Sequence, residues 1–169
     1  MKFCSKDEAV RYMNRSGLSG RSFIFIVDYK QEHVWVEEPD AVDPEELLYD
    51  LNGFTNVTGN GKQYPKKQVE WETEPVSFET YSRSFQIVSG HIRAGNSYLV
   101  NLTCATPVRT NLTLKEIFYS SQAPYRLWLR DRFVIFSPEI FVRMEDGFIY
   151  SYPMKGTIDA SRPDARERI

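Results

Sequence analysis

The chain has 169 residues, of which 41% are hydrophobic and 14% aromatic, so it is long and apolar enough to fold around a core. Its formal net charge of -2 argues against a nucleic-acid binder, because no basic excess is available to neutralise phosphates. The two cysteines, Cys4 and Cys104, are far apart and lack metal-ligand spacing. No apolar run is long enough to span a bilayer, and the first residues lack the apolar core of a signal peptide. We therefore expect a soluble, cytoplasmic protein that contacts no membrane.

The first predicted elements are a helix and two strands. Ser5 and Glu8 have the spacing of a capping box, which opens a short helix that ends near Gly17. Residues 22–29 are apolar and β-rich, which predicts a buried strand. Residues 33–37 alternate, and we expect them to pair with the first strand as a hairpin.

A second short helix is predicted at Asp43-Pro44, where aspartate can cap the helix and proline suits its first turn. Asn52-Gly53 should end it. Residues 55–75 are polar and rich in Gly, Asn and Lys, which indicates a linker or a mobile loop.

The strongest helix prediction covers residues 77–94, where apolar side chains at spacings of four, three and four form one stripe. Ser77 can cap its start, and Gly95 suits the left-handed position at its end. Residues 98–108 alternate and predict a long strand.

The remaining pattern is short and mostly strand-like. A short helix should open at Asn111, and Asp146-Gly147 is typical of a hairpin turn. The other predicted strands are 125–130, 132–136, 140–145 and 148–152, and charged residues 161–169 indicate the start of a helix. Together these elements predict an α+β fold with mainly antiparallel sheets and outer helices.

Two groups with complementary chemistry follow predicted strands. Lys155 stands in Pro153-Met154-Lys155-Gly156-Thr157, after strand 148–152, and Glu139 stands in Ser137-Pro138-Glu139, after strand 132–136. A hairpin between them would bring both to one edge. An amine beside a carboxylic acid is typical of covalent catalysis with proton donation to a leaving group. A lone lysine is more often a solvated surface residue, and the flanking Pro and Gly favour function here.

Three segments carry a resemblance to the chorismate-utilising enzymes: Gly95-Asn96-Ser97-Tyr98-Leu99-Val100-Asn101-Leu102-Thr103, Ser137 to Glu139, and Pro153 to Thr157. Their order and spacing also match. Within the family, the lysine resembles the aminodeoxychorismate synthase branch (component I), because the related anthranilate synthases usually carry a small residue there. The resemblance covers roughly the last half of the chain and implies a partial anthranilate-synthase-like fold of two packed sheets.

The resemblance also implies roles for four residues. Lys155 would attack C2 of chorismate, and Glu139 would protonate the departing C4 hydroxyl. Ammonia from a glutamine amidotransferase subunit would then attack C4 and expel the lysine, giving 4-amino-4-deoxychorismate for folate synthesis. Gly156 and Thr157 would present an amide or a hydroxyl to a substrate carboxylate.

Position 99 distinguishes branches of the family. The water-adding branch carries a lysine at this position, and many ammonia-using members carry glutamine. Leu99 can neither deprotonate water nor hydrogen-bond to a hydroxyl, so it argues against water addition and against the substrate contact that glutamine would make at this position.

The family's catalytic domain implies a further stretch with magnesium-binding glutamates, for which no match is found. We therefore expect residues 1–75 to form an N-terminal α+β segment and 76–169 the first part of a chorismate-binding domain, incomplete at its C-terminus. Mg²⁺ is expected for the full enzyme, with its ligands absent from this chain, and the fragment alone should be inactive. Anthranilate-synthase-like direct amination and a non-catalytic binding or assembly module remain alternatives.

Overall fold

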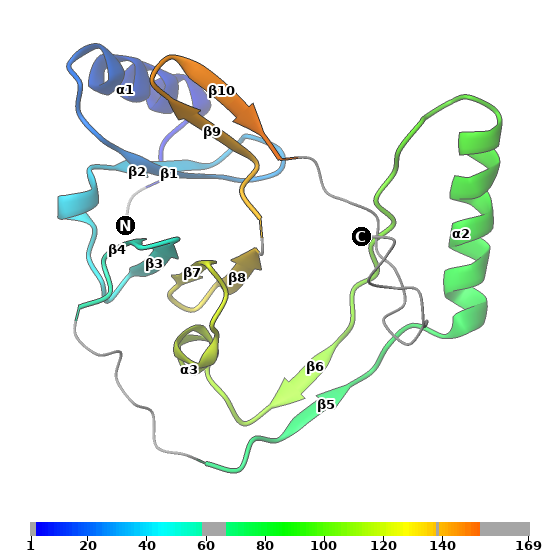
Figure 1. Cartoon of the computed structure of the whole chain (residues 1–169). Helices are drawn as coiled ribbons and strands as arrows, with labels where there is room; N and C mark the ends of the chain where they lie inside the picture. Colours follow the sequence, from blue (N-terminus) through cyan, green and yellow to red (C-terminus); the bar gives the residue numbers. More distant parts are fainter. Residues whose placement is uncertain (1–2, 59–66, 138, 153–169) are drawn as a thin grey trace. The chain divides into compact units, whose positions relative to one another are not determined.

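The computed structural model describes residues 3–58, 67–137 and 139–152. Within these residues lie three α-helices, a short 3-10 helix and ten strands, and every strand pair is antiparallel (Figure 1). The chain divides into two compact units, residues 1–64 with 114–169, and residues 65–113. The predicted α+β class with mainly antiparallel sheets is confirmed, whereas the division between residues 75 and 76 stays a prediction.

The N-terminal helix and hairpin form as predicted. Helix α1 (Lys6–Leu18) begins at the Ser5–Glu8 capping box and packs on β2. Strands β1 (Ile24–Val27) and β2 (Val34–Glu37) pair so that Val27 lies opposite Val34. The prediction of a buried β1 was wrong for half of its residues, because alternate side chains face opposite sides of the hairpin and those of Phe25 and Val27 are exposed.

A four-stranded sheet lies at the centre of the first unit. Its order is β4-β3-β7-β8, so that β3 (Leu47–Leu51) pairs with β4 (Phe54–Thr55) and with β7 (Tyr125–Leu129). Strand β8 (Phe133–Ser137) pairs with β7. Consequently the central pairing of the unit joins two parts of the chain that are far apart in sequence.

Strand β3 buries side chains on both faces of this sheet, since its first three residues are buried and successive residues face opposite sides. On one face the core residues are Ile24, Trp35, Val42, Leu47, Tyr49 and Leu129. On the other they are Leu48, Phe118 and Trp128, the second of which belongs to helix α3 (Leu114–Ser120). The helix therefore covers one face, and residues of the β1–β2 hairpin pack on the other.

The helix predicted at Asp43-Pro44 was wrong. The Asp43 carbonyl accepts the N–H groups of Glu46 and Leu47 at 3.0 Å each, which closes a single turn. The chain then enters β3, whose first three residues are all buried. Pairing with β7 and burial on both faces outweigh a helix propensity of a few tenths of a kcal/mol per residue. Asn52 and Gly53, at φ of 55° and 96°, form the hairpin turn to β4.

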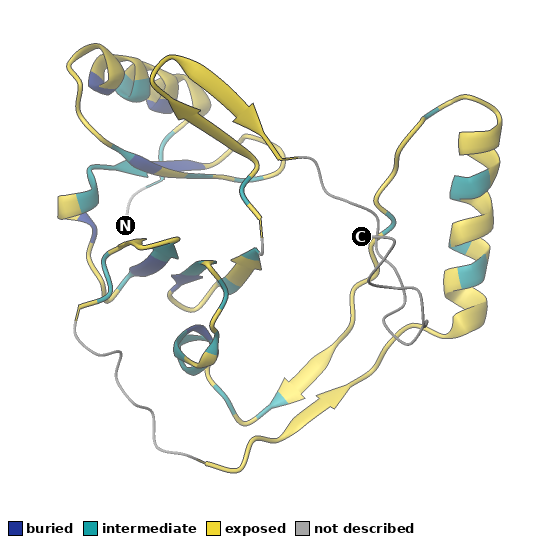
Figure 2. Cartoon of the chain, viewed as in Figure 1, coloured by how far each residue is buried: buried dark blue, intermediate teal, exposed yellow. Residues whose placement is uncertain are grey.

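In the second unit, α2 (Phe78–Arg93) forms as predicted. Ser77 caps its start by accepting the N–H of Thr80 at 3.2 Å, and Gly95 takes a φ of 75° after its end. None of the α2 residues is buried (Figure 2). Its apolar stripe of Tyr81, Phe85, Val88 and Ile92 therefore lies open in this unit.

The long strand predicted over residues 98–108 was wrong, since only Val108–Thr110 (β6) is strand. It pairs with β5 (Trp71–Thr73), which composition had assigned to a loop. Tyr98 and Leu99 are 95% and 90% exposed, and no described strand pairs with them. Alternation alone does not hold a strand without a partner edge.

The predicted helix at Asn111 begins later, at Leu114. The Asn111 side chain instead accepts the N–H of Glu70 at 3.2 Å and donates to the carbonyl of Gln68 at 2.9 Å. The end of the second unit is thereby tied to the segment before β5, and the helix starts after it.

Strands β9 (Val142–Glu145) and β10 (Phe148–Ser151) form the predicted hairpin. Asp146 and Gly147 lie at its turn, with φ of 52° and 80°. Every residue of this hairpin is exposed. The helix start predicted at residues 161–169 lies outside the described residues. No helix in the described part of the chain is long and apolar enough to cross a membrane.

Candidate functional site

The predicted acid, Glu139, follows the end of β8. Ser137 is the last residue of that strand, and its hydroxyl donates to the Glu139 carbonyl at 2.7 Å. The same hydroxyl accepts the Glu139 N–H at 3.3 Å. Ser137 thus bonds to both backbone groups of Glu139, and Glu139 is exposed.

The β9–β10 hairpin returns the chain towards the position of Glu139. Val142 lies opposite Ser151, so the two strand ends that lead to Glu139 and to residue 152 are neighbours. Lys155, Gly156 and Thr157 lie outside the described residues. The strands that precede the two groups do not pair with each other, because β8 pairs with β7 and β10 pairs with β9 in a separate sheet. The contact between Glu139 and Lys155 stays a prediction.

One basic residue of this hairpin, Arg143, was not among the predicted site residues. It lies opposite Tyr150 in the strand register and forms an ion pair with Glu145 at 2.5 Å. The hydrogen bond from this guanidinium to Glu145 raises the pKa of Arg143 above its ordinary value, and Tyr152 adds to the effect. The alternation in residues 140–145 was the sequence signal for this ion pair, because in a strand residues 143 and 145 lie on one face.

Leu99 lies in the second unit, in a segment without regular structure. Its carbonyl accepts a hydrogen bond from the Ser97 hydroxyl at 3.1 Å, and the residue is 90% exposed. An alkyl side chain offers no proton acceptor, so the argument against water activation at this position rests on the residue type.

Among the described residues, one group of three side chains could together hold a metal ion: Asp28, Glu32 and His33, at the β1–β2 turn. Asp28 Oδ2 lies 3.1 Å from His33 Nδ1, and its Oδ1 accepts the Glu32 N–H at 2.8 Å. Partial desolvation raises the pKa of Asp28, but these hydrogen bonds outweigh it and hold the pKa below its ordinary value. Mg²⁺ prefers an octahedral shell of oxygens, so this group with its imidazole does not fit that ion.

Comparison with known proteins identifies the family of this chain. The family model described as chorismate binding enzyme matches residues 21–168. The chain is 36% identical over 160 residues to an uncharacterized PabA-like protein of Haemophilus influenzae, covering 95% of this chain and 48% of that protein. It is 38% identical over 160 residues to an uncharacterized PabA-like protein of Pasteurella multocida, covering 95% of this chain and 49% of that one.

The chain therefore spans about half the length of the curated relatives it matches. No solved structure matches it. The family match covers the segments that hold Glu139 and Lys155, and it extends upstream through the central sheet to residue 21. This chain belongs to the chorismate binding enzyme family.

Proposed function

We propose that this chain is part of a chorismate-aminating enzyme that makes 4-amino-4-deoxychorismate for folate synthesis. The observation that carries the proposal is Lys155 in Pro153-Met154-Lys155-Gly156-Thr157, within the matched family segment. A primary amine at this position offers a nucleophile that a small residue cannot supply.

The proposed reaction has two displacements. The neutral amine of Lys155 forms a bond to C2 of chorismate while the C4–oxygen bond breaks, and Glu139 gives its proton to the departing hydroxyl, which leaves as water. Ammonia then forms a bond to C4, and the bond between C2 and Lys155 breaks. The nucleophile is thereby regenerated, and the amino group ends on C4.

The described structure supports the required neighbourhood of the two groups. The Ser137 hydroxyl bonds to the backbone of Glu139, and the β9–β10 hairpin sets Ser151 opposite Val142, the first residue of the strand that follows Glu139. Gly156 and Thr157 are proposed to contact a substrate carboxylate through an amide and a hydroxyl. Mg²⁺ is proposed as the cofactor of the whole enzyme, with its ligands outside this chain.

A glutamine amidotransferase subunit is the proposed source of ammonia. Ammonia must be present in the unprotonated form to attack C4, and delivery from a bound partner supplies it away from bulk water. The PabA-like names of two relatives agree with a role in the same pathway. We propose a cytoplasmic location because chorismate amination needs soluble substrates only.

The test uses the whole enzyme that contains this chain, with chorismate, ammonium and Mg²⁺, and product formation followed by mass spectrometry. Lys155→Ala should lower the rate by at least about 10²-fold, because the covalent route is lost. Lys155→Arg should not restore it, since a guanidinium stays protonated. Lys30→Ala, which changes an exposed lysine of the β1–β2 turn, is the matched control and should leave the rate unchanged.

A substrate adduct trapped on Lys155 would support the covalent mechanism. An undiminished rate in Lys155→Ala would instead favour direct amination of the anthranilate synthase kind, and formation of anthranilate would establish it. Absence of any aminated product from the whole enzyme would leave the non-catalytic binding module as the better description.

A further inference from the structure

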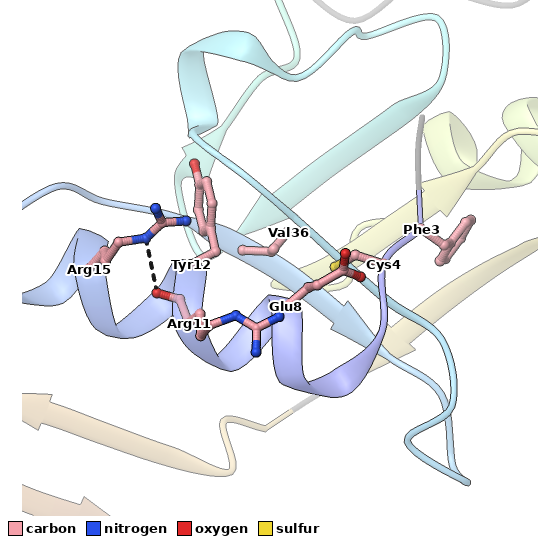
Figure 3. A pocket seen from close by; sticks show the side chains of 7 residues that line it. All are labelled: Phe3, Cys4, Glu8, Arg11, Tyr12, Arg15 and Val36. Atoms are coloured by element: carbon pink, nitrogen blue, oxygen red, sulfur yellow. Dashed lines mark hydrogen bonds between the residues drawn. The ribbon is translucent and has the colours of Figure 1, made fainter.

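A pocket of about 380 Å³ opens between α1 and β2, and the proposed chemistry does not use it (Figure 3). Its apolar surface comes from three half-buried side chains, those of Phe3, Cys4 and Val36. Its polar surface comes from one side of α1. Pockets that bind small molecules commonly combine an apolar lining with a few placed polar groups.

The walls of this pocket are held by backbone contacts on both sides. The Cys4 N–H donates to the Val34 carbonyl at 2.8 Å, and the Val34 N–H donates to the Cys4 carbonyl at 3.1 Å. The Ser5–Glu8 capping box then fixes where α1 begins. These hydrogen bonds therefore fix the start of α1 against β2 next to the pocket.

The α1 side of the pocket is unusually polar for a surface that faces a strand. Glu8, Arg11, Tyr12 and Arg15 have the spacing of three, four and seven residues that places side chains on one helix face. Figure 3 shows Val36 reaching from β2 towards this row. Helix faces beside a strand usually carry apolar residues at these positions, so the charged row leaves an open space instead of a packed contact.

The two arginines of this row have no carboxylate within ion-pair distance among the described residues. Arg15 Nε donates to the Arg11 carbonyl at 3.4 Å, which leaves the terminal nitrogens of both guanidinium groups available. Glu8 Oε2 is already occupied, because it accepts from the Ser5 N–H at 2.9 Å and from the Ser5 hydroxyl at 2.8 Å. This face of α1 therefore carries the two positive charges of Arg11 and Arg15 and one carboxylate, that of Glu8, which takes part in the capping box.

We propose that this pocket binds a small aromatic carboxylate. The ring would lie against Val36, Cys4 and the Tyr12 ring, and the carboxylate would accept hydrogen bonds from Arg11 and Arg15. Guanidinium groups bind carboxylates through two parallel hydrogen bonds, and apolar atoms gain from leaving water. None of these residues belongs to the Glu139–Lys155 region, so the proposal stands or fails independently of the proposed function.

Benzoate is the probe, titrated into the ¹⁵N-labelled chain and followed by nuclear magnetic resonance. Benzoate should shift the amide signals of α1 and of β2 around Val36, with a dissociation constant on the order of 1 mM for so small a ligand. Acetate, which lacks the ring, and benzyl alcohol, which lacks the charge, should each bind at least about tenfold more weakly.

The double variant Arg11→Gln/Arg15→Gln should weaken benzoate binding at least about tenfold. Both residues are exposed, so far-UV circular dichroism should show an unchanged fold. Arg83→Gln, which removes an exposed arginine from another helix, is the matched control and should leave binding unchanged. The proposal is overturned if the double variant binds benzoate as tightly as the unchanged chain does, or if benzyl alcohol binds as tightly as benzoate. It is also overturned if benzoate shifts only the signals of other elements.

Discussion

The Asn56 side chain completes the edge of the central sheet, and its removal is a sharp test of how that edge is held. Strands β3 and β4 pair through only two positions, Asp50 opposite Thr55 and Leu51 opposite Phe54. Beyond them, Asn56 Oδ1 accepts the Tyr49 N–H at 2.9 Å, and Nδ2 donates to the Leu47 carbonyl at 2.8 Å. One amide side chain thus replaces a strand neighbour.

Asn56→Ala leaves both of these backbone groups without that partner. Tyr49 and Leu47 are no more than 2% exposed, so water replaces the lost amide poorly. An orphaned buried group costs about 1–3 kcal/mol, and two of them with partial relaxation predict a loss of about 2–4 kcal/mol in the free energy of unfolding. This loss is a large part of the roughly 5–15 kcal/mol typical of a folded domain.

Urea unfolding followed by circular dichroism measures this loss, and amide hydrogen exchange reports on the Tyr49 N–H directly. The matched control is Asn14→Ala on α1, whose side chain is exposed, and it should change stability by less than about 0.5 kcal/mol. If Asn56→Ala also stays within about 0.5 kcal/mol, or if the exchange of the Tyr49 N–H is unchanged, the two side-chain hydrogen bonds do not hold this edge.

Three further outcomes are expected. Glu139→Gln in the whole enzyme should keep the fold and lower the rate of chorismate amination by about 10²–10⁴-fold, measured by product formation, because no proton reaches the leaving hydroxyl. Burial, aided by the charge of Asp40, raises the pKa of Tyr49 above its ordinary value of 10.0. Folding stability should therefore fall as pH rises beyond 10.0. Tyr49→Phe should remove this loss, measured by thermal unfolding at alkaline pH. The lowered pKa of Asp28 stabilises the fold at pH values above its ordinary pKa of 3.8, and this stability is lost as pH falls below 3.8. Asp28→Asn should therefore lose less stability than the unchanged chain in acid unfolding. An identical acid profile would contradict the His33 contact.

The sequence alone was enough to predict helices and turns whose ends are defined by capping or turn residues close in sequence. The Ser5–Glu8 capping box, the Ser77 cap and the glycine after α2 predicted both long helices. Asp146-Gly147 predicted the β9–β10 turn. In each case the hydrogen bonds or the positive φ that define the element involve residues close in sequence, so no distant partner is required.

The motif at residues 153–157, the Ser137–Glu139 segment and their spacing also indicated the family before any fold was known. The match over residues 21–168 confirmed that family. The roles of Lys155 and Glu139 stay predictions, because a residue's role depends on which groups face it, and their facing groups are not determined by spacing.

Only the tertiary structure decided the conformation of two segments for which the local sequence indicated something else. Residues 47–51 follow a helix-like start, yet they form β3 because β7, far along the chain, supplies a partner edge and both faces are buried. Residues 98–107 alternate like a strand, yet they form none because no described strand pairs with them. The central strands are stabilised by hydrogen bonds to neighbours that the local sequence does not contain, whereas a helix satisfies its own backbone. This is why the sequence alone predicted α1 and α2, and only pairing with β7 decided β3.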